Sequence, residues 1–220
     1  MRNHFAKKTV LLIILLTAAL LCSQAVSAQG NPKTAAEFNT RGNEYFKNED
    51  FDKAIADYSQ AIKLERKNPD YYYNRGNAYY NKRDLDKAIT DFSQAIKLDK
   101  NHVRSYYGRA ICYHAKDDYN KAIADYNKTT ELDPKHVRAY YNLGNTYILK
   151  RDYSSAILEY TQAVSLNPDF TEAYYNRGLA NRALGFFDSA ISDFETVLRI
   201  DPNNADAKKS LEEAKKRGKK

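Results

Sequence analysis

Beyond position 28, the side chains best suited to acid–base or nucleophilic catalysis near pH 7 are three histidines and one cysteine, since the many carboxylates recur at periodic solvent or cap positions. His102 and His136 stand 34 residues apart at the same place in a repeating pattern, and His114 lies between them. The metalloprotease, P-loop and nucleophile-elbow motifs, which place catalytic groups at fixed spacing, are missing from the sequence. Cys112 aligns mostly with small residues, which favours a packing role over a reactive thiol. The sequence therefore predicts no catalysis, no cofactor and no metal site.

Binding chemistry is more prominent, because tyrosine and asparagine recur at helical spacing. Tyrosine offers a rigid apolar ring with a hydrogen-bonding hydroxyl, and the asparagine amide carries a donor and an acceptor that match a peptide bond. Such a surface suits an extended peptide or a partner helix laid along it. The candidate peptide-binding residues are Asn43, Tyr73, Asn74, Asn77, Arg104, Tyr107, Arg138, Tyr141, Asn142, Asn145, Tyr175 and Asn176.

These residues recur because the sequence repeats every 34 residues. One register position always holds a small residue, namely Gly42, Gly76, Ala110, Gly144 and Gly178. No insertion or deletion interrupts the period, which predicts stacked units that bury their apolar faces only against their neighbours. The predicted units are residues 35–68, 69–102, 103–136, 137–170 and 171–204.

Each unit has the pattern of two amphipathic helices. In the second unit the first helix is predicted from about Asp70 to Lys82, and the second helix begins after Asp84, a favourable N-cap. Phe186 occupies that cap position in the fifth unit. Small residues should let the two helices approach closely, while a large ring fills the next layer. The second-helix alanines are Ala54, Ala88, Ala122, Ala156 and Ala190, and the rings are Tyr58, Phe92, Tyr126, Tyr160 and Phe194.

This pattern resembles the tetratricopeptide repeat from about Ala35 to Asn204. The resemblance implies an all-α fold, a right-handed α-solenoid of five antiparallel helix pairs with a concave groove lined by the first helix of each pair. Residues 205–220 look like the cap helix that usually follows such repeats, ending in a basic tail.

The resemblance also suggests a comparison with the family's clamp for a C-terminal carboxylate. Asn43, Asn74 and Arg104 fit that clamp. Asn39 replaces one of its bases and Gly108 replaces the other. Three of five positions are met, so the sequence favours a groove without a complete clamp.

An arginine precedes the small residue in four units, where the family usually has an apolar residue. These are Arg41, Arg75, Arg109 and Arg177, and Leu143 is the exception. A buried guanidinium needs a partner. The second helices of the same four units carry Asp57, Asp91, Asp125 and Asp193, whereas the Leu143 unit carries Glu159. We therefore predict an Arg–Asp pair repeated along the stack, within a unit or to the next unit.

Residues 1–28 have the pattern of a secretory signal peptide. Basic residues precede an apolar run that begins at Val10, and Val26-Ser27-Ala28 supplies the small residues of a cleavage site. A retained signal anchor and lipidation at Cys22 are the alternatives, although the apolar run is short for a membrane span. Cleavage near Ala28 predicts an exported chain, periplasmic or secreted, that keeps Cys112 as its one cysteine and forms no intramolecular disulfide.

The net charge of +7 arises mostly at the two ends of the chain. Residues 1–28 carry three bases and no acid, and residues 208–220 carry seven bases and two acids, which leaves the rest at −1. A basic helix end usually complements the helix dipole. We therefore expect no nucleic-acid partner, and at most a weak contact between the Lys-rich tail and an anionic surface.

Two functions fit this sequence. The first is a non-catalytic exported scaffold that binds a protein or peptide segment in the concave groove. The second is a carbohydrate- or cell-wall-binding accessory protein whose tyrosines stack on sugar rings. Exposed ring faces would favour sugar, and asparagine amides arranged as a ladder would favour peptide. The sequence leaves the partner and the oligomeric state open.

Overall fold

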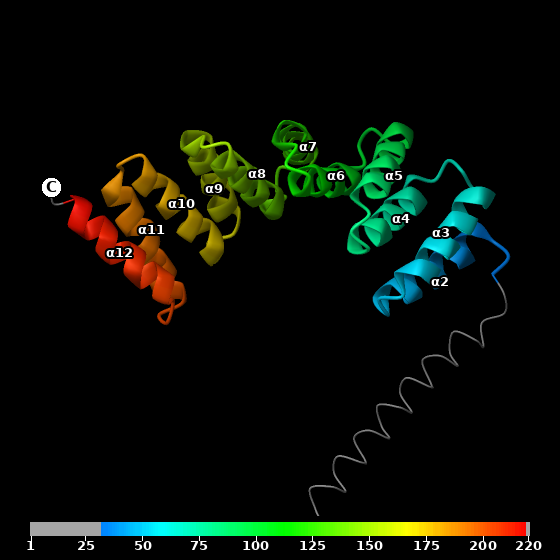
Figure 1. Ribbon diagram of the computed structural model, residues 1–220, viewed down its shortest axis with the longest axis horizontal. Helices are drawn as coiled ribbons and strands as arrows, with labels where there is room; N and C mark the ends of the chain where they lie inside the picture. Colours follow the sequence, from blue (N-terminus) through cyan, green and yellow to red (C-terminus); the bar gives the residue numbers. More distant parts are fainter. Residues whose placement is uncertain (1–31, 219–220) are drawn as a thin grey trace, which may run out of the picture.

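The computed structural model describes residues 32–218, which form an arch of helices (Figure 1). The predicted signal peptide, residues 1–28, lies outside the described residues. The first helices of the five units are α2 (Ala35–Lys47), α4 (Pro69–Asn81), α6 (Val103–Ala115), α8 (Val137–Leu149) and α10 (Thr171–Ala183). The second helices are α3 (Phe51–Leu64), α5 (Leu85–Leu98), α7 (Tyr119–Leu132), α9 (Tyr153–Leu166) and α11 (Phe187–Ile200). Helix α12 (Ala205–Gly218) follows them.

Aspartate caps start four of the five second helices, as predicted. Asp152, for example, accepts a hydrogen bond at 3.1 Å from the backbone N–H of Ser155, which satisfies one of the orphan donors of the first turn. Asp50, Asp84 and Asp118 do the same at α3, α5 and α7. Phe186 gives α11 no side-chain cap.

The two helices of a unit touch where the small residues lie, which confirms the predicted packing. A Cβ atom placed on Gly144 would lie 2.6 Å from Cε1 of Tyr160, closer than atoms in contact allow. Gly42, Gly76 and Gly178 stand equally close to the ring of their own second helix. The ring residues and the facing alanines are buried, so each unit carries its own interhelical core.

A tight turn joins the two helices of every unit and depends on one residue in the left-handed region. Four of these residues carry side chains, with φ between 59° and 65°, and they are Glu49, Arg83, Asp117 and Arg151. The fifth is Gly185, at φ 82°. A left-handed residue with a Cβ costs about 1 kcal/mol, so the surrounding helices must hold these turns in place.

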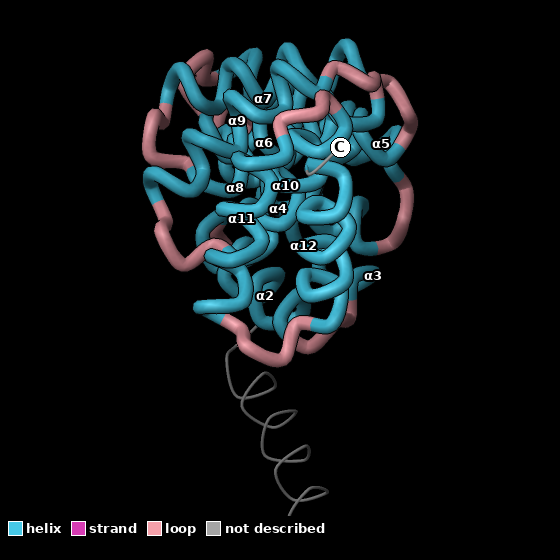
Figure 2. Tube along the Cα trace, turned by 90° about the vertical axis from the view of Figure 1, so that its left-hand side faces the viewer, coloured by secondary structure: helices cyan, strands magenta, loops and turns pink. Residues whose placement is uncertain are grey.

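Stacking places the first helices on the inner side of the arch. Each second helix packs on the first helix of the next unit, and α2 contacts α4, α4 contacts α6, and α8 contacts α10. Helix α12 covers the last unit and buries Ala207, Leu211 and Ala214 against it. Seen from the C-terminal end, the turns lie around the outside of the stack (Figure 2). None of the helices in residues 32–218 combines the length and the hydropathy that a membrane-spanning segment requires.

Candidate binding groove

A ladder of side-chain hydrogen bonds runs along the inner face from one unit to the next. Asn74 donates from Nδ2 to Asn39 Oδ1 at 2.8 Å. Asn142 and Asn176 occupy the same register position, and their Nδ2 groups donate to the hydroxyls of Tyr107 (3.0 Å) and Tyr141 (3.2 Å). At the C-terminal end Ser210 of α12 lies in this register, 3.5 Å from the hydroxyl of Tyr175. The rungs therefore tie α4 to α2, α8 to α6, α10 to α8 and α12 to α10, whereas Gly108 of α6 has no side chain to form one.

The ladder is one-sided, because it uses the donors of these amides and leaves their acceptors open. Among residues 32–218, no donor bonds to Oδ1 of Asn74, Asn142 or Asn176. Each free oxygen belongs to a side chain that is only partly buried. The inner face thus presents a row of unused amide acceptors, which match the N–H groups of an extended chain.

A second register on the same helices presents amide donors. Asn43 Oδ1 accepts the hydroxyl of Tyr58 at 2.8 Å, and Asn145 Oδ1 accepts that of Tyr160 at 2.7 Å. In the described part of the chain, the Nδ2 groups of these two asparagines make no hydrogen bond. In the second unit Phe92 replaces the tyrosine, and the Asn77 side chain makes no hydrogen bond within residues 32–218. Open donors therefore lie on α2 and α8, and each is followed by an open acceptor on the first helix of the next unit, α4 or α10.

The tyrosine rings of the inner face pack against other side chains of the protein. Tyr107 stacks on His136 at 4.5 Å between ring centroids, and Tyr141 stacks on Phe170 at 4.8 Å. Tyr73 lies 5.5 Å from His102 and has the guanidinium of Arg104 over its ring at 4.7 Å. A stacking role for His102, His136 and Phe170 was not predicted from the sequence. Their 34-residue spacing, directly before α6, α8 and α10, was the available signal.

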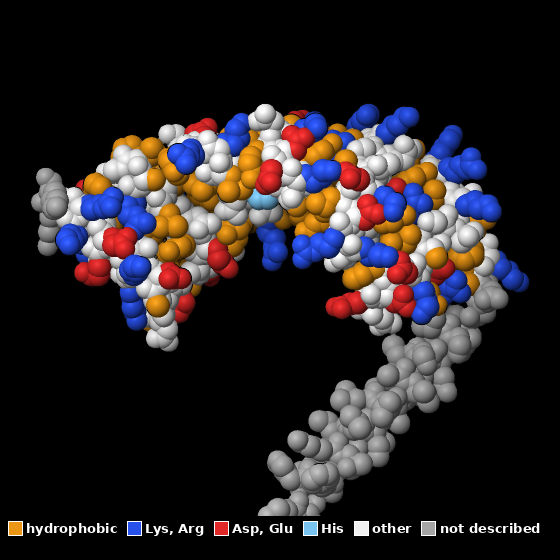
Figure 3. Space-filling view, in the orientation of Figure 1, with side chains coloured by type: hydrophobic (Ala, Val, Ile, Leu, Met, Phe, Trp, Pro, Cys, Tyr) orange, Lys and Arg blue, Asp and Glu red, His pale blue; other side chains and the backbone are white. Residues whose placement is uncertain are grey.

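Two arginines of the inner face lie in different surroundings. Arg104 is ion-paired with Asp70 of the preceding unit. Arg138 is exposed and lines a cavity of about 530 Å³ beside Asp169 and Glu172. Basic side chains also project into the hollow beneath the middle of the arch (Figure 3). Because Arg104 is engaged and Gly108 has no side chain, the structure does not assemble the family's carboxylate clamp.

The comparison with known proteins settles the family. A model described as "TPR repeat" matches residues 42–83, 112–150 and 144–185, which together make up more than half of the chain. Models described as "Tetratricopeptide repeat" match residues 69–102, 92–124 and 171–204. The chain belongs to the tetratricopeptide repeat (TPR) family.

Proteins similar to this chain match it over different shares of its length. Serine/threonine-protein phosphatase 5 of Rattus norvegicus is 49% identical over 47 residues, which are 21% of this TPR chain and 9% of the phosphatase. The crystal structure of MamA superposes with a TM-score of 0.71 at 27% identity and covers 75% of this chain and 96% of that one. The structure of YrrB, described as a TPR protein with an unusual peptide-binding site, gives 0.69 at 18% identity over 89% of this chain and 97% of its own. The likeness to YrrB shows the fold.

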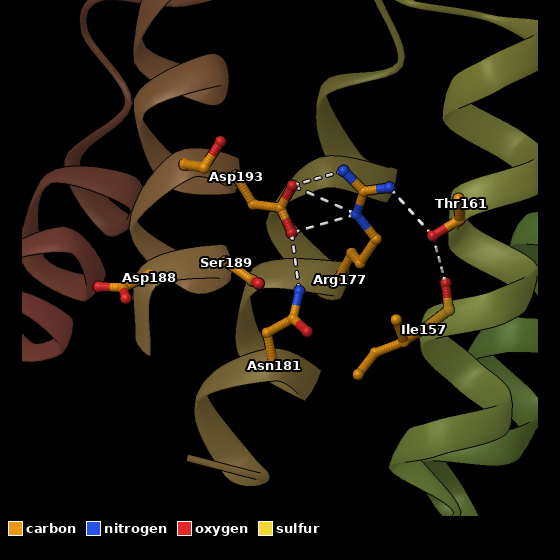
Figure 4. Close-up of a pocket in the computed structure, with 8 residues that line it drawn as sticks. Ile157, Thr161, Arg177, Asn181, Asp188, Ser189 and Asp193 are labelled. Carbon is orange, nitrogen blue, oxygen red and sulfur yellow. Dashed lines mark hydrogen bonds and ion pairs between the residues drawn. The ribbon is translucent and has the colours of Figure 1, made fainter. Parts of the chain in front are cut away.

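The arginines that distinguish this TPR chain are paired as predicted, and each pair lies within one unit. Arg109 donates from Nε and Nη2 to the two carboxylate oxygens of Asp125, at 2.7 and 2.8 Å. Its Nη1 donates to Ser93 of the preceding unit at 2.9 Å. Arg177 repeats the arrangement with Asp193 and with Thr161 of α9, as Figure 4 shows. Arg75, Arg109 and Arg177 therefore each join three helices, which fixes the register between units.

The fourth unit of the TPR stack lacks this pair. Leu143 is fully buried where the other units have arginine. Glu159, at the position of the paired aspartates, has no salt-bridge partner in residues 32–218, and burial raises its pKa above the ordinary value. The folded protein therefore disfavours the ionised form of this carboxylate.

Replacing Glu159 with glutamine should stabilise the protein at neutral pH. A raised folded-state pKa means that Glu159 weakens stability as pH rises through its unfolded and then its folded pKa, so the gain should be absent near pH 3 and full at pH 7. We expect about 0.5 to 1 kcal/mol in urea unfolding at pH 7. Asp193→Asn is the matched control and should destabilise, because it leaves Arg177 without its carboxylate. A Glu159→Gln gain of equal size at both pH values would contradict the explanation.

Cys112 should be unreactive in the folded TPR protein. Its side chain is fully buried, and burial raises the pKa of the thiol to about 12, so almost none is thiolate at pH 8. An aromatic disulfide reagent should label it at least about a hundredfold more slowly in buffer than in 6 M urea, a difference set by thiolate fraction and access. Rapid labelling of the native protein would show that the third unit opens readily.

The remaining histidine of the inner face is held by hydrogen bonds. The Thr146 hydroxyl donates to the carbonyl of Asn142 at 2.7 Å, so His114 Nδ1 must donate to Thr146 Oγ1, 2.9 Å away. Burial lowers the pKa of His114, which keeps the ring neutral at pH 7. Within residues 32–218, no group of three or more His, Cys, Asp or Glu side chains could hold a metal ion.

Proposed function

We propose that this chain is an exported, non-catalytic scaffold that binds an extended protein or peptide segment along its concave face. TPR proteins in general mediate protein–protein interaction. The observation that carries the more specific proposal is the one-sided asparagine ladder, because its unused acceptors and the donors of the neighbouring register complement a peptide backbone. The identity of the segment is set by side-chain contacts along the groove.

Selection of random peptides against residues 29–220 tests this proposal. Replacing Asn74, Asn142 and Asn176 together with alanine should weaken a selected peptide by about tenfold or more, since each lost hydrogen bond contributes about 0.5 to 1.5 kcal/mol. The matched control replaces three exposed asparagines outside this ladder, Asn48, Asn127 and Asn203. Equal affinity of both triple variants, at unchanged thermal stability, would place binding elsewhere.

The packing of the tyrosines argues against the glycan alternative. Sugar binding needs open aromatic faces, whereas Tyr73, Tyr107 and Tyr141 are packed against Arg104, His136 and Phe170. A soluble chitin oligosaccharide is the probe for this alternative. We expect no binding at millimolar concentration, and saturable binding lost in Tyr141→Ala would favour the glycan function instead.

Export is the second part of the proposal and rests on the N-terminal sequence. Full-length chain produced in a bacterial host should appear outside the cytoplasm, with a mass that corresponds to residues 29–220. Retention of residues 1–28 in a membrane fraction would support the signal-anchor alternative.

A further inference from the structure

Two cavities of the groove occupy equivalent places, three units apart. One lies between the first and second units and has a volume of about 220 Å³, and the other lies between the fourth and fifth units and has about 260 Å³. The first is lined by Asn43, Phe46, Lys47, Tyr58, Asn74 and Asn77. The second has at the same register positions Asn145, Ile148, Leu149, Tyr160, Asn176 and Leu179, with His114 added.

Both cavities present the same pair of unused amide groups. In the second cavity Asn145 Oδ1 is saturated by Tyr160 and by Asn176 Nδ2 at 3.1 Å, which leaves Asn145 Nδ2 as a donor. Asn176 Oδ1 is left as an acceptor among the described residues. Asn43 Nδ2 and Asn74 Oδ1 repeat this arrangement in the first cavity. A donor and an acceptor on neighbouring helices suit the C=O and N–H of one stretch of peptide backbone.

The walls of the two cavities differ in chemistry. Lys47 and Asn77 of the first are replaced in the second by Leu149 and Leu179. Leu149 is 52% exposed although it is a large aliphatic residue. Among the described residues, no charged side chain lines the second cavity, since His114 is neutral at pH 7. Its volume is below the range of about 300 to 1,000 Å³ that is usual for whole small-molecule ligands, so it fits one side chain.

We propose that the cavity between the fourth and fifth units is a subsite for one large aliphatic side chain of the bound segment, while Asn145 and Asn176 hydrogen-bond the backbone beside that side chain. The inference rests on the proposed function and specifies its partner, which is an extended segment with leucine, isoleucine or methionine at this place. The equivalent cavity between the first and second units, with Lys47 at its wall, takes a polar or acidic side chain.

The smallest probe is a leucine capped at both ends, N-acetyl-leucine N′-methylamide, because it carries one aliphatic side chain between two peptide bonds. For a ligand of this size we expect a Kd of about 1 mM. In NMR titrations of residues 29–220, the side-chain amides of Asn145 and Asn176 and the methyl groups of Leu149 and Leu179 should shift together. Capped glycine and capped glutamate should bind at least about tenfold more weakly.

Three variants distinguish binding at the subsite from nonspecific hydrophobic binding. Leu149→Lys introduces the residue found at position 47 and should abolish the saturable shifts, whereas Leu158→Lys, at a leucine of α9 that is 65% exposed, should leave them unchanged. Lys47→Leu combined with Asn77→Leu should create a second site for capped leucine, with shifts at Asn43 and Asn74. This gain of binding cannot result from unfolding.

The outcomes distinguish this inference from the proposed function. Equal binding of capped leucine and capped glycine, or shifts unaffected by Leu149→Lys, would overturn the aliphatic subsite. If selected peptides still bind through Asn74, Asn142 and Asn176, the scaffold function then stands with another specificity. If no peptide binds the inner face at all, both fail.

Discussion

Asp125→Ala should lower the free energy of unfolding by about 3 to 5 kcal/mol, the cost of removing one partner of a buried ion pair. Asp125 is buried and receives two hydrogen bonds from Arg109, whose side chain is itself mostly buried. The substitution leaves a desolvated guanidinium with Ser93 as its remaining hydrogen-bond partner in the described structure. Urea unfolding of residues 29–220, followed by circular dichroism, measures the effect.

Two controls show whether the loss comes from the unpaired charge. Replacing Arg109 and Asp125 together with leucine should restore much of the stability, because the chain itself places a buried leucine, Leu143, at the equivalent position of the fourth unit. Asp52→Ala breaks the exposed pair with Lys82 and should cost about 1 kcal/mol or less. A double variant as unstable as Asp125→Ala would contradict the explanation, since its loss would then come from packing.

Gly144→Leu should destabilise the protein by about 3 kcal/mol, at the upper end of the cost of overpacking a core. Even a Cβ at this position lies 2.6 Å from Cε1 and 3.0 Å from Cζ of Tyr160. The Tyr160 ring is fully buried and its hydroxyl is bonded to Asn145, so it has little room to move. Displacing it would also disturb the amide that faces the groove. The melting temperature and the affinity for a selected peptide should therefore both fall.

Gly144→Ala is the graded control. The third unit already carries alanine, Ala110, opposite Tyr126, which shows that this contact can accommodate one methyl group. Alanine also has a higher helix propensity than glycine by about 1 kcal/mol, which offsets part of the clash. The alanine variant should change stability by less than about 1 kcal/mol. A leucine variant as stable as wild type would mean that the helices of the fourth unit are not held at this contact.

The sequence predicted the fold because each structural requirement is repeated five times in a fixed register. The small residues, the aspartate caps and the buried rings each determine a contact between neighbouring helices, so spacing alone locates them. The Arg–Asp pairs could be predicted from charge balance. Four units carry arginine on the first helix together with aspartate on the second, and the one unit without the arginine also lacks the aspartate. Their connection within a unit, and the third bond to Ser93 or Thr161, required coordinates.

The groove was less predictable, because residue type does not fix which atoms of an amide are used. Asn142 and Asn176 were candidates for their amides, but only the structure shows that their donors are engaged and their acceptors open. The stacking of His136 on Tyr107 depends on how the loop packs on the next helix. Leu149 was not among the candidates, although it is the exposed leucine at a position where other units have lysine, asparagine or alanine.

The most direct measurement of the central claim is a crystal structure of residues 29–220 with a selected peptide bound. We expect an extended peptide in the hollow of the arch, with a backbone N–H on Asn176 Oδ1 and a backbone carbonyl on Asn145 Nδ2. A peptide bound to the outer helices, or one in the hollow that leaves both amides without hydrogen bonds, would contradict it.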